Sequence, residues 1–571
     1  MSYKLNTYLK NIREQEWGAQ SYLPGLRQPI AFVYPNVYRL GMSNLGLHIL
    51  YQLINARGDS ACERYFLPEK GLLEEHRLSR TPLLSVETGR PLADNKVIFV
   101  MLSFEMDYDN LLTVLDLGHI KLHACERKEK EPLVIIGGPC ATFNPEPLAE
   151  VADAFVIGEG EETVQQILDK VYSLNSRAER LQALSQLPGV YVPSFYEPRY
   201  EDGAYRGLKP LEGAPVRIAR QWVRDIDAYP HTSAILTRET EFEDMYIVET
   251  ARGCGRHCRF CMAGYCFRKP RNRALENIIA DIEHRPERTR KIGLMGAAVS
   301  DHPQIDELIS YLAARKLPFS IASLRADRLN KLLAESLANC GQRTLTVAPE
   351  AGSERMRAAI NKGITEEHIY NACELAAGAG MQNIKLYYMI GLPGEENEDV
   401  EETVAMILRV RRRMDELGNK GELVVSVNAF VPKPFTPYQW EPLCAVKTLK
   451  ARFKLLNDGL KRNRKIKLIT ESLKETVIQS ILARGDRHIG RYILEAHEQQ
   501  LSLKQVLRQH GIDAEILAET SLPRGSVLPW SHLDMGVTEG YLAKEAARSR
   551  EGKFTPMCFE GCSRCGVCGN E

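Results

Sequence analysis

Two series of short, β-rich apolar runs dominate this 571-residue sequence, and helical stretches lie between the runs. The first series lies within residues 1–215 and contains AFVYP (31–35), KVIFVMLS (96–103), LVIIGG (133–138) and AFVIGEGE (154–161). Short buried strands that alternate with helices predict a parallel, doubly wound sheet. Such sheets bind ligands outside the carboxyl ends of their strands, which here carry Pro35, Ser103, Gly137, Gly138 and Gly158.

The second series begins after a predicted linker at residues 216–240. Its strand candidates are MYIVET (245–250), KIGLMG (291–296), FSIASL (319–324), TLTVAP (344–349), KLYYMIG (385–391) and VVSVNAF (424–430). Amphipathic segments such as 305–316 and 398–417 separate most of them, so six β/α units predict a partial (β/α)6 barrel with its chemistry on the loops after the strands. We therefore expect an α/β protein with a doubly wound domain at 1–215, a partial barrel at 216–440 and a helical region with a Cys-rich tail at 441–571.

Charge and hydropathy give no sign of a secreted or membrane protein, and they leave local charged patches possible. Lys plus Arg equals Asp plus Glu at 74 each, so no net charge steers the chain toward nucleic acid or acidic membranes. The polar N-terminus has no signal-peptide core, and no apolar run is long enough to span a bilayer. We expect a cytoplasmic protein without a membrane partner.

Cys254, Cys258 and Cys261 form a C-x3-C-x2-C motif in the loop after the first barrel strand. Three thiolates from one short loop can hold three irons of a [4Fe–4S] cluster and leave the fourth iron open for the amino and carboxylate groups of S-adenosylmethionine. Gly253 and Gly255 suit a loop that needs unusual backbone angles, and Phe260 could pack beside the cofactor. The alternatives are a zinc site with a distant fourth ligand and reduced thiols without metal.

With these motifs the chain resembles the radical S-adenosylmethionine superfamily over residues 240–440. The matching segments are the cysteine motif, LMGAAVSDHP (294–303), SLRAD (323–327), TVAPEAGSER (346–355), IGLPGE (390–395) and FVPKPFTPYQW (430–440). The resemblance implies that Gly296 and Ala297 accept from the methionine amino group, and that Ser323, Arg325 and Glu350 contact the carboxylate and ribose. Each of these could instead be an ordinary polar group at a strand end. The resemblance also implies an electron donor such as flavodoxin or ferredoxin.

Residues 25–170 resemble the cobalamin-binding domain that precedes many radical S-adenosylmethionine enzymes. The matching segments are YPNVYRLGMSNLGLHILYQL (34–53), IGGPCATFNPEP (136–147) and FVIGEGEET (155–163). Cobalamin domains that ligate cobalt through histidine carry D-x-H-x-x-G, and none of His48, His76, His119 and His123 has that context. The domain could bind cobalamin with its lower face unligated, or serve as a cap or docking surface.

Cys558, Cys562, Cys565 and Cys568 form a second motif, C-x3-C-x2-C-x2-C, near the C-terminus. Four thiolates so close in sequence suit a loop wrapped round one centre. The interpretations are a second [4Fe–4S] cluster, structural zinc and a flexible redox tail. The whole chain resembles an uncharacterised family of fused cobalamin-domain radical proteins that have such a tail and a motif like LPWSHLDMGV (528–537).

Three functions follow from these resemblances. The first is a radical transferase that modifies an unactivated carbon. One form of this hypothesis is cobalamin-dependent methyl transfer. The second is sulfur insertion, or another auxiliary-cluster reaction, on RNA or protein, similar to methylthiotransferases, although those enzymes carry their extra cysteines in an N-terminal domain. The third is a non-catalytic redox or cobalamin sensor. The sequence identifies neither the substrate nor the residues that act on it.

Three basic runs, at 268–273, 409–413 and 461–467, are hypothetical contacts for RNA phosphates. The alternative for each run is a solvated helix face. The first run is of most interest because it follows the cysteine loop directly.

Overall fold

The computed structural model describes residues 2–23 and 25–568 of the chain. The chain forms two compact units. The first unit comprises Met1–Met245, Ile481–Ala514 and Gly525–Gly536, and the second comprises Tyr246–Ser480, Glu515–Arg524 and Val537–Glu571.

The units and the expected domains divide the chain differently. The first unit extends past residue 215 because β9 (Ile218–Ala219) pairs with β19 (Leu533–Asp534) and Leu236 pairs with Trp17. The expected third region is shared between the units. Its helix α18 (Arg487–Glu498) contacts α5 (Tyr108–Leu117) of the first unit, whereas α16 (Val446–Leu460) contacts α15 (Asn397–Glu416) of the second.

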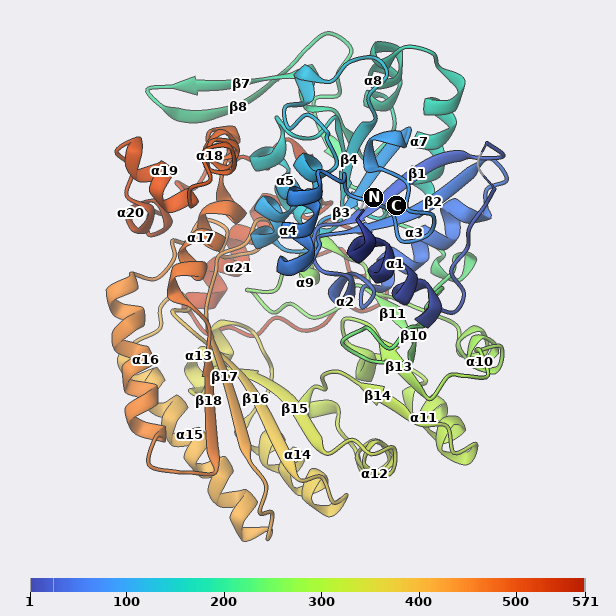
Figure 1. Ribbon diagram of the computed structural model, residues 1–571. Helices are drawn as coiled ribbons and strands as arrows, with labels where there is room; N and C mark the ends of the chain where they lie inside the picture. The colour runs from blue at the N-terminus through green and yellow to red at the C-terminus, as the bar shows by residue number, and fades with distance from the viewer. Residues whose placement is uncertain (1, 24, 569–571) are drawn as a thin grey trace. The chain divides into compact units, whose positions relative to one another are not determined.

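A six-stranded sheet with the order β2-β1-β3-β4-β5-β6 forms the centre of the first unit (Figure 1). Its strands are parallel except for β6, which is antiparallel to β5. The bounds are β1 (Gln28–Tyr34), β2 (Ser60–Phe66), β3 (Val97–Met101), β4 (Leu133–Gly137), β5 (Ala154–Val156) and β6 (Val190–Tyr191). The four expected strands are β1, β3, β4 and β5, so the prediction of a parallel, doubly wound sheet is confirmed.

The sequence did not reveal β2 because its charged residues are buried. Every residue of this strand is buried, including Glu63 and Arg64. The Arg64 guanidinium lies 2.7 Å from the Glu16 carboxylate and 2.6 Å from that of Glu87, and Arg90 pairs with Glu63. Ion pairs compensate these buried charges, so polarity in the sequence does not indicate exposure here.

Helices cover this sheet, and apolar side chains such as Ile30, Phe99 and Ile135 fill its core. The helix α3 begins at Asn44, whose side chain accepts from the Leu47 amide, and it buries Leu47, Ile49 and Ile54. The unit's helices are α1 (Tyr3–Gln15), α2 (Tyr38–Gly41), α3 (Leu45–Ala56), α4 (Lys70–Ser79), α5 (Tyr108–Leu117), α6 (Pro139–Phe143), α7 (Glu161–Ser173), α8 (Arg177–Ser185), α18 and α19 (Leu503–Gln509). A hairpin of β7 (Tyr196–Glu201) and β8 (Ala204–Pro210) extends from it (Figure 1).

Two sheets form the second unit, with the orders β10-β13-β14 and β15-β16-β17-β18. The strands are β10 (Met245–Glu249), β13 (Lys291–Met295), β14 (Phe319–Ile321), β15 (Thr344–Glu350), β16 (Asn383–Ile390), β17 (Leu423–Ala429) and β18 (Ile466–Thr470). A parallel bridge between Leu324 and Val347 joins the two sheets. All six expected strands are present in the expected order, and β18 is an additional parallel strand at the edge.

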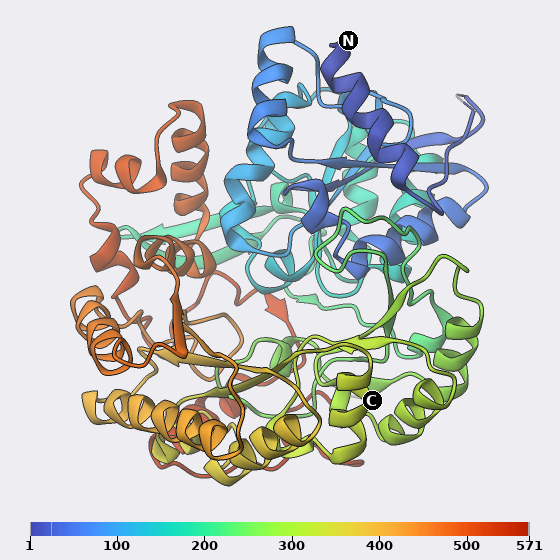
Figure 2. The same cartoon turned by 60° about the horizontal axis from the view of Figure 1, so that its bottom comes forward.

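The helices of this unit lie along the outer side of its row of strands, as Figure 2 shows. They are α10 (Leu275–Glu283), α11 (Ile305–Ala314), α12 (Lys331–Asn339), α14 (Glu366–Gly378), α15 (Asn397–Glu416) and α16. Two further helices of the unit are α13 (Glu354–Ala359) and α21 (Glu539–Arg550), which contact each other. The helices α17 (Leu473–Arg484) and α20 (Ala514–Ala518) cross the boundaries between the units. Because these helices lie along the sides of the strands, the loops after the strands are left free to form a site.

Candidate functional site

The cysteine loop, residues 253–270, is closed at its base by a short antiparallel ladder. The strand β11 (Ala251–Arg252) follows β10 and pairs with β12 (Arg271–Asn272). Gly253 begins the loop with φ of +78°, and a Cβ atom there would lie 2.1 Å from the Phe267 carbonyl oxygen. Only glycine fits a left-handed position this crowded. The loop therefore begins and ends at one point beside the first strand of the second unit.

The three cysteines of the loop are close enough to act on one another. Cys258 is buried, and Cys254 and Cys261 are half-buried. Burial, together with the neighbouring thiols of Cys258 and Cys254, raises the pKa of Cys261 to about 12. Among residues 2–23 and 25–568, no three His, Cys, Asp or Glu side chains form a group that could hold one metal ion. A [4Fe–4S] cluster spreads its ligands more widely, because each thiolate binds a different iron, so this set of donors fits a cluster.

Arg259 anchors the cysteine loop to two other segments of the second unit. Its buried guanidinium donates to the carbonyls of Ala359 (2.7 Å) and Lys553 (2.6 Å) and lies 3.1 Å from the Glu545 carboxylate. A buried arginine is tolerated only with such partners. The loop is thus tied to the end of α13 and to α21.

Arg256 connects the cysteine loop to the loops after β13 and β14. It lies 2.7 Å from the Asp301 carboxylate and 3.2 Å from that of Asp327. Burial alone would raise the pKa of Asp327, but Arg325 and Arg256 outweigh this effect and lower it. Both aspartates lie in segments that resemble the superfamily, LMGAAVSDHP and SLRAD, yet nothing in the sequence indicated that one arginine would join them.

Four of the expected cofactor contacts lie at the ends of β13 and β14. Gly296 is half-buried, and a Cβ atom there would lie 3.0 Å from the Ala251 carbonyl oxygen, so this strand end passes close to the start of the cysteine loop. Ala297 and Ser323 are exposed. Arg325 is half-buried and donates to Asp327 (2.9 Å) and to the Lys362 carbonyl (3.0 Å).

Lys362 joins the other two expected contacts, and the sequence analysis missed it. Its ammonium lies 3.0 Å from the Glu350 carboxylate and 5.9 Å from the centre of the Phe260 ring. Lys362 is only 8% exposed, and Glu350 ends β15 in a left-handed conformation with φ of +70°. Strained residues of this kind concentrate at functional sites. The only feature of the sequence that could have pointed to Lys362 was the Lys-Gly pair after a helix. Such a pair also suits an ordinary helix end.

The C-terminal cysteines gather in a second loop, residues 551–568, after α21. Cys562 and Cys565 are buried, and Cys558 and Cys568 are half-buried. Burial raises the pKa of Cys558, Arg268 opposes the rise, and the charges of the other three cysteines add to it. The four thiols are therefore neighbours, and four thiolates are donors that an iron–sulfur cluster uses, one for each iron.

The three arginines of the basic run at 268–273 are neither exposed to RNA phosphates nor part of a solvated helix face, whereas Lys269 is half-buried. Arg268, Arg271 and Arg273 are all buried, and Arg273 lies 2.6 Å from the Glu249 carboxylate. Buried guanidiniums cannot reach the phosphates of a nucleic acid. In the run at 409–413, Arg409 of α15 pairs with Glu402 of the same helix and with Glu366 of α14, so its charge is compensated on a helix face.

The sheet order of the first unit creates a topological switch point between β1 and β3, because the chain continues to opposite sides from these two strands. Two apolar side chains remain exposed in the segments after these strands, Leu40 at 39% and Phe104 at 45%. Beside them the Asn44 amide donates to the Ser103 hydroxyl over 3.3 Å. Apolar surface with adjacent amide and hydroxyl groups suits a large cofactor that carries amide side chains.

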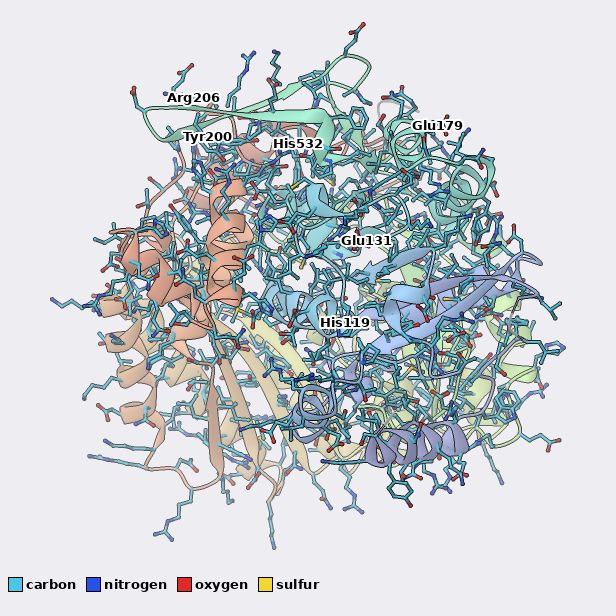
Figure 3. All side chains as sticks on the ribbon, turned by 45° about the horizontal axis from the view of Figure 1, so that its top comes forward. His119, Glu131, Glu179, Tyr200, Arg206 and His532 are labelled. Carbon is cyan, nitrogen blue, oxygen red and sulfur yellow. The ribbon has the colours of Figure 1, made fainter. Side chains whose placement is uncertain are left out.

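His48 does not offer a ligand at this edge. His48 is buried, its Nε2 lies 3.0 Å from the Met42 carbonyl oxygen, and its Nδ1 accepts from the Ile235 amide. Burial lowers the pKa of His48 to about 4. His76 bonds to the Thr81 carbonyl, and His119, labelled in Figure 3, is exposed after α5.

The segment that contains LPWSHLDMGV has a structural role in the first unit. Glu146, after β4, lies 2.9 Å from Arg487 of α18 and accepts from the Tyr191 hydroxyl (2.6 Å). The His532 ring packs on Tyr191 with 4.6 Å between ring centres (His532 is labelled in Figure 3). These buried groups hold the segment and α18 against the sheet.

Family models match both halves of the chain. Residues 46–193 match the model for the N-terminal region of radical SAM proteins, and residues 248–407 match the model of the radical SAM superfamily. The second match contains the cysteine loop and all the expected cofactor contacts. None of the helices in the described part of the chain has the length and hydropathy needed to cross a membrane.

Three curated relatives are similar in sequence. An uncharacterized protein of Methanocaldococcus jannaschii is 29% identical over 81% of this chain and 90% of its own length. An uncharacterized methyltransferase of Pyrococcus horikoshii is 26% identical over 48% of this chain and 56% of its own. A tRNA-2-methylthio-N(6)-dimethylallyladenosine synthase of Carboxydothermus hydrogenoformans is 26% identical over 28% of this chain and 39% of its own.

Two solved structures are similar in fold. The radical S-adenosylmethionine methyltransferase TsrM of Kitasatospora setae has a TM-score of 0.46 and 14% identity, over 72% of this chain and 74% of its own. The cobalamin-dependent S-adenosylmethionine radical enzyme OxsB has a TM-score of 0.45 and 13% identity, over 92% of this chain and 79% of its own.

Proposed function

Because this chain belongs to the radical S-adenosylmethionine superfamily and is one of its enzymes, we propose that it acts as a transferase on an unactivated carbon. In this proposal Cys254, Cys258 and Cys261 hold a [4Fe–4S] cluster that reductively cleaves S-adenosylmethionine to a 5′-deoxyadenosyl radical. The observation that carries the proposal is the closed cysteine loop, which holds three neighbouring thiols and which Arg256 joins to the loops after β13 and β14. The substrate is left open.

The residues around the loop supply binding and orientation. The half-buried Gly296 leaves its backbone accessible beside the start of the cysteine loop, where the amino group of the cofactor would bind. Glu350 accepts hydrogen bonds from the ribose hydroxyls, and Arg325 donates to the carboxylate. Phe260 and Lys362 form the side of the site that excludes water. Arg256 holds the three strand-end loops in one arrangement, which limits the loss of entropy when the cofactor binds.

Lys362 offers a direct test of this arrangement. We expect Lys362→Met to weaken S-adenosylmethionine binding about tenfold, about 1.4 kcal/mol, because Glu350 would lose the cation that orients it. Equilibrium dialysis of the reconstituted protein measures this affinity. Lys331→Met is the matched control, since Lys331 is exposed on α12. Equal affinity in the two variants would remove Lys362 from the site.

We further propose that the first unit binds cobalamin over the switch point between β1 and β3, so that the enzyme transfers a methyl group from this cofactor. The exposed side chains of Leu40 and Phe104 and the polar groups of Asn44 and Ser103 support this site. The buried state of His48 implies that the lower face of the cobalt has no histidine ligand from this position.

Replacing Leu40 and Phe104 together with alanine tests the cobalamin site. Each buried apolar side chain contributes about 1.5–3 kcal/mol, so we expect hydroxocobalamin to be retained at least about tenfold more weakly. Cobalt per chain after desalting is the measurement. Leu78→Ala, at an exposed position of α4, controls for the loss of surface leucine. Retention at the level of this control would place the cobalamin elsewhere or exclude it.

One experiment tests the whole assignment. The protein is reconstituted anaerobically with iron and sulfide, soaked with hydroxocobalamin and desalted, and iron, zinc and cobalt are measured per chain. We expect about eight irons, for two [4Fe–4S] clusters, and about one cobalt. Four irons with zinc would make the C-terminal centre structural. Absence of cobalt would make the first unit a cap or docking platform.

The second candidate function is auxiliary-cluster chemistry, such as sulfur insertion into RNA or protein. The Cys558 amide donates to the carbonyl of Gly255 in the cysteine loop over 2.8 Å, and this contact favours auxiliary-cluster chemistry. The similarity to the methylthio-tRNA synthase favours it as well. A product that contains sulfur from the protein, detected after labelling the reconstituted sulfide with ³⁴S, would support this function over methyl transfer.

A further inference from the structure

Residues 359–362, at the end of α13 and directly after it, accept hydrogen bonds from the cysteine loop. The Arg259 amide donates to the Ile360 carbonyl over 3.0 Å, and the Arg259 guanidinium donates to the Ala359 carbonyl over 2.7 Å. The last carbonyls of a helix have no partner within the helix, so they are available for such bonds. Arg259 directly follows Cys258, and the end of α13 therefore fixes the middle of the cysteine loop.

Asn361 joins the same loop to the C-terminal segment. Its side-chain nitrogen donates to the His257 carbonyl over 3.1 Å and to the Thr555 carbonyl over 3.0 Å, and its side-chain oxygen accepts from the Thr555 amide over 2.8 Å. These bonds use both donors of the side chain and one acceptor position. Asn361 is only 5% exposed, so the bonds are shielded from water and hold the two segments together.

The residue after Asn361 reaches the expected cofactor contacts. Lys362 pairs with Glu350, and the Lys362 carbonyl accepts from the Arg325 guanidinium over 3.0 Å. Asn361 itself has φ of +54°, a left-handed conformation that asparagine adopts more readily than most residues. Two adjacent residues therefore hold the cysteine loop on one side and the expected contacts for S-adenosylmethionine on the other.

A closed network of buried groups supports Thr555, the partner of Asn361. The Thr555 hydroxyl donates to the Glu545 carboxylate over 2.8 Å, and this carboxylate lies 3.1 Å from the Arg259 guanidinium. Thr555, Glu545 and Arg259 are all buried. A buried polar network whose members are satisfied makes its surroundings rigid. The network returns to the cysteine loop through Arg259, so Asn361 belongs to a ring of contacts that fixes the position of this loop.

We propose that Asn361 is a positioning residue of this enzyme, which fixes the cysteine loop relative to the cofactor contacts at Arg325 and Glu350. This inference rests on the proposed function. Asn361 acts through the carbonyl of His257 on one side and through its neighbour Lys362 on the other. A cofactor that is held by two sets of contacts reacts fast only while the two sets keep one spacing, and a displacement of about 1 Å can cost about 10²-fold in rate.

Hydrogen exchange of the metal-free, full-length protein tests whether Asn361 holds the loop. Asn361→Gly removes the side chain and keeps a residue that tolerates the left-handed backbone. We expect the amides of residues 253–262 to exchange at least about tenfold faster, because the His257 and Thr555 carbonyls lose their donor. Mass spectrometry of peptides measures this exchange. Lys316→Gly is the matched control, since Lys316 has φ of +55° and is exposed just after α11. Unchanged exchange in the loop, or an equal acceleration in the strand β16, would overturn the positioning role.

Kinetics of the reconstituted protein separate a positioning role from a merely structural one. With saturating S-adenosylmethionine and titanium(III) citrate as the reductant, we expect Asn361→Gly to form 5′-deoxyadenosine at least about tenfold more slowly per bound iron, with iron per chain near that of the wild type. Lys362→Met should instead raise chiefly KM. Asn361→Asp keeps the acceptor for the Thr555 amide but loses both donors, so it should not restore the rate.

The outcomes distinguish the inference from the proposed function. A loss of iron in proportion to the loss of rate in Asn361→Gly would assign this residue a merely structural role and overturn the inference. A rate per bound iron equal to that of the wild type would overturn it as well. Failure of the wild-type protein to cleave S-adenosylmethionine would instead overturn the proposed function.

Discussion

Replacing Cys258 with alanine is expected to abolish reductive cleavage of S-adenosylmethionine. Cys258 is the most deeply buried of the three loop cysteines, and the open iron exists only while three thiolates hold the other three. We expect the rate to fall by more than about 10³-fold, about 4 kcal/mol in the barrier. Anaerobic assays of 5′-deoxyadenosine with titanium(III) citrate, together with iron per chain, measure the effect.

Cys340→Ala is the matched control for this variant. Cys340 lies at the end of α12, is half-buried and belongs to neither cysteine motif. We expect this control to keep its full iron content. Continued cleavage by Cys258→Ala at a rate near that of the control would show that the cluster is not held as proposed.

Gly253→Ala is expected to have the second large effect, on assembly of the loop. An alanine at φ of +78° costs about 1–2 kcal/mol in backbone strain. Its Cβ atom would also lie 2.1 Å from the Phe267 carbonyl oxygen, which must then move. We expect a total destabilisation of about 3–5 kcal/mol, in the range of the most damaging single substitutions. Iron per chain after reconstitution and the thermal unfolding midpoint are the measurements.

The chain offers a control that separates strain from overlap. Gly341, after α12, has a similar φ of +81°, but a Cβ atom there meets nothing within 4 Å. Gly341→Ala should therefore lose only the backbone contribution of about 1–2 kcal/mol and keep its iron. Equal losses in the two variants would mean that the crowding at Gly253 has no role in holding the loop.

Local patterns were sufficient for most of the fold. The run 133–138 is apolar throughout, because a strand buried on both faces needs no polar side, and it became β4. The strand β2 was not predicted because its charged residues Glu63 and Arg64 are buried in ion pairs. A polar residue in a sequence does not reveal whether its partner, here Glu87, will be brought beside it by folding.

The basic run at 268–273 also shows that polarity in the sequence does not determine exposure. Its spacing is that of a nucleic-acid contact, but Arg273 meets Glu249 and Arg268 meets Cys558. The charge count of the run is a local property, whereas its exposure depends on segments far away in the chain. Interpretations of charge runs are therefore safe only when the partners are also local, as for Arg409 and Glu402 on α15.

The amino-acid order was enough to reveal the α/β architecture and the two cysteine motifs, because strand periodicity and thiolate spacing are properties of short segments. Lys362 beside Glu350, Arg256 between Asp301 and Asp327, and Cys558 against Gly255 could be found only in three dimensions. Each of these contacts joins residues that are distant in sequence. The energy of such a contact depends on the distance and burial that folding creates, and no local pattern encodes either quantity.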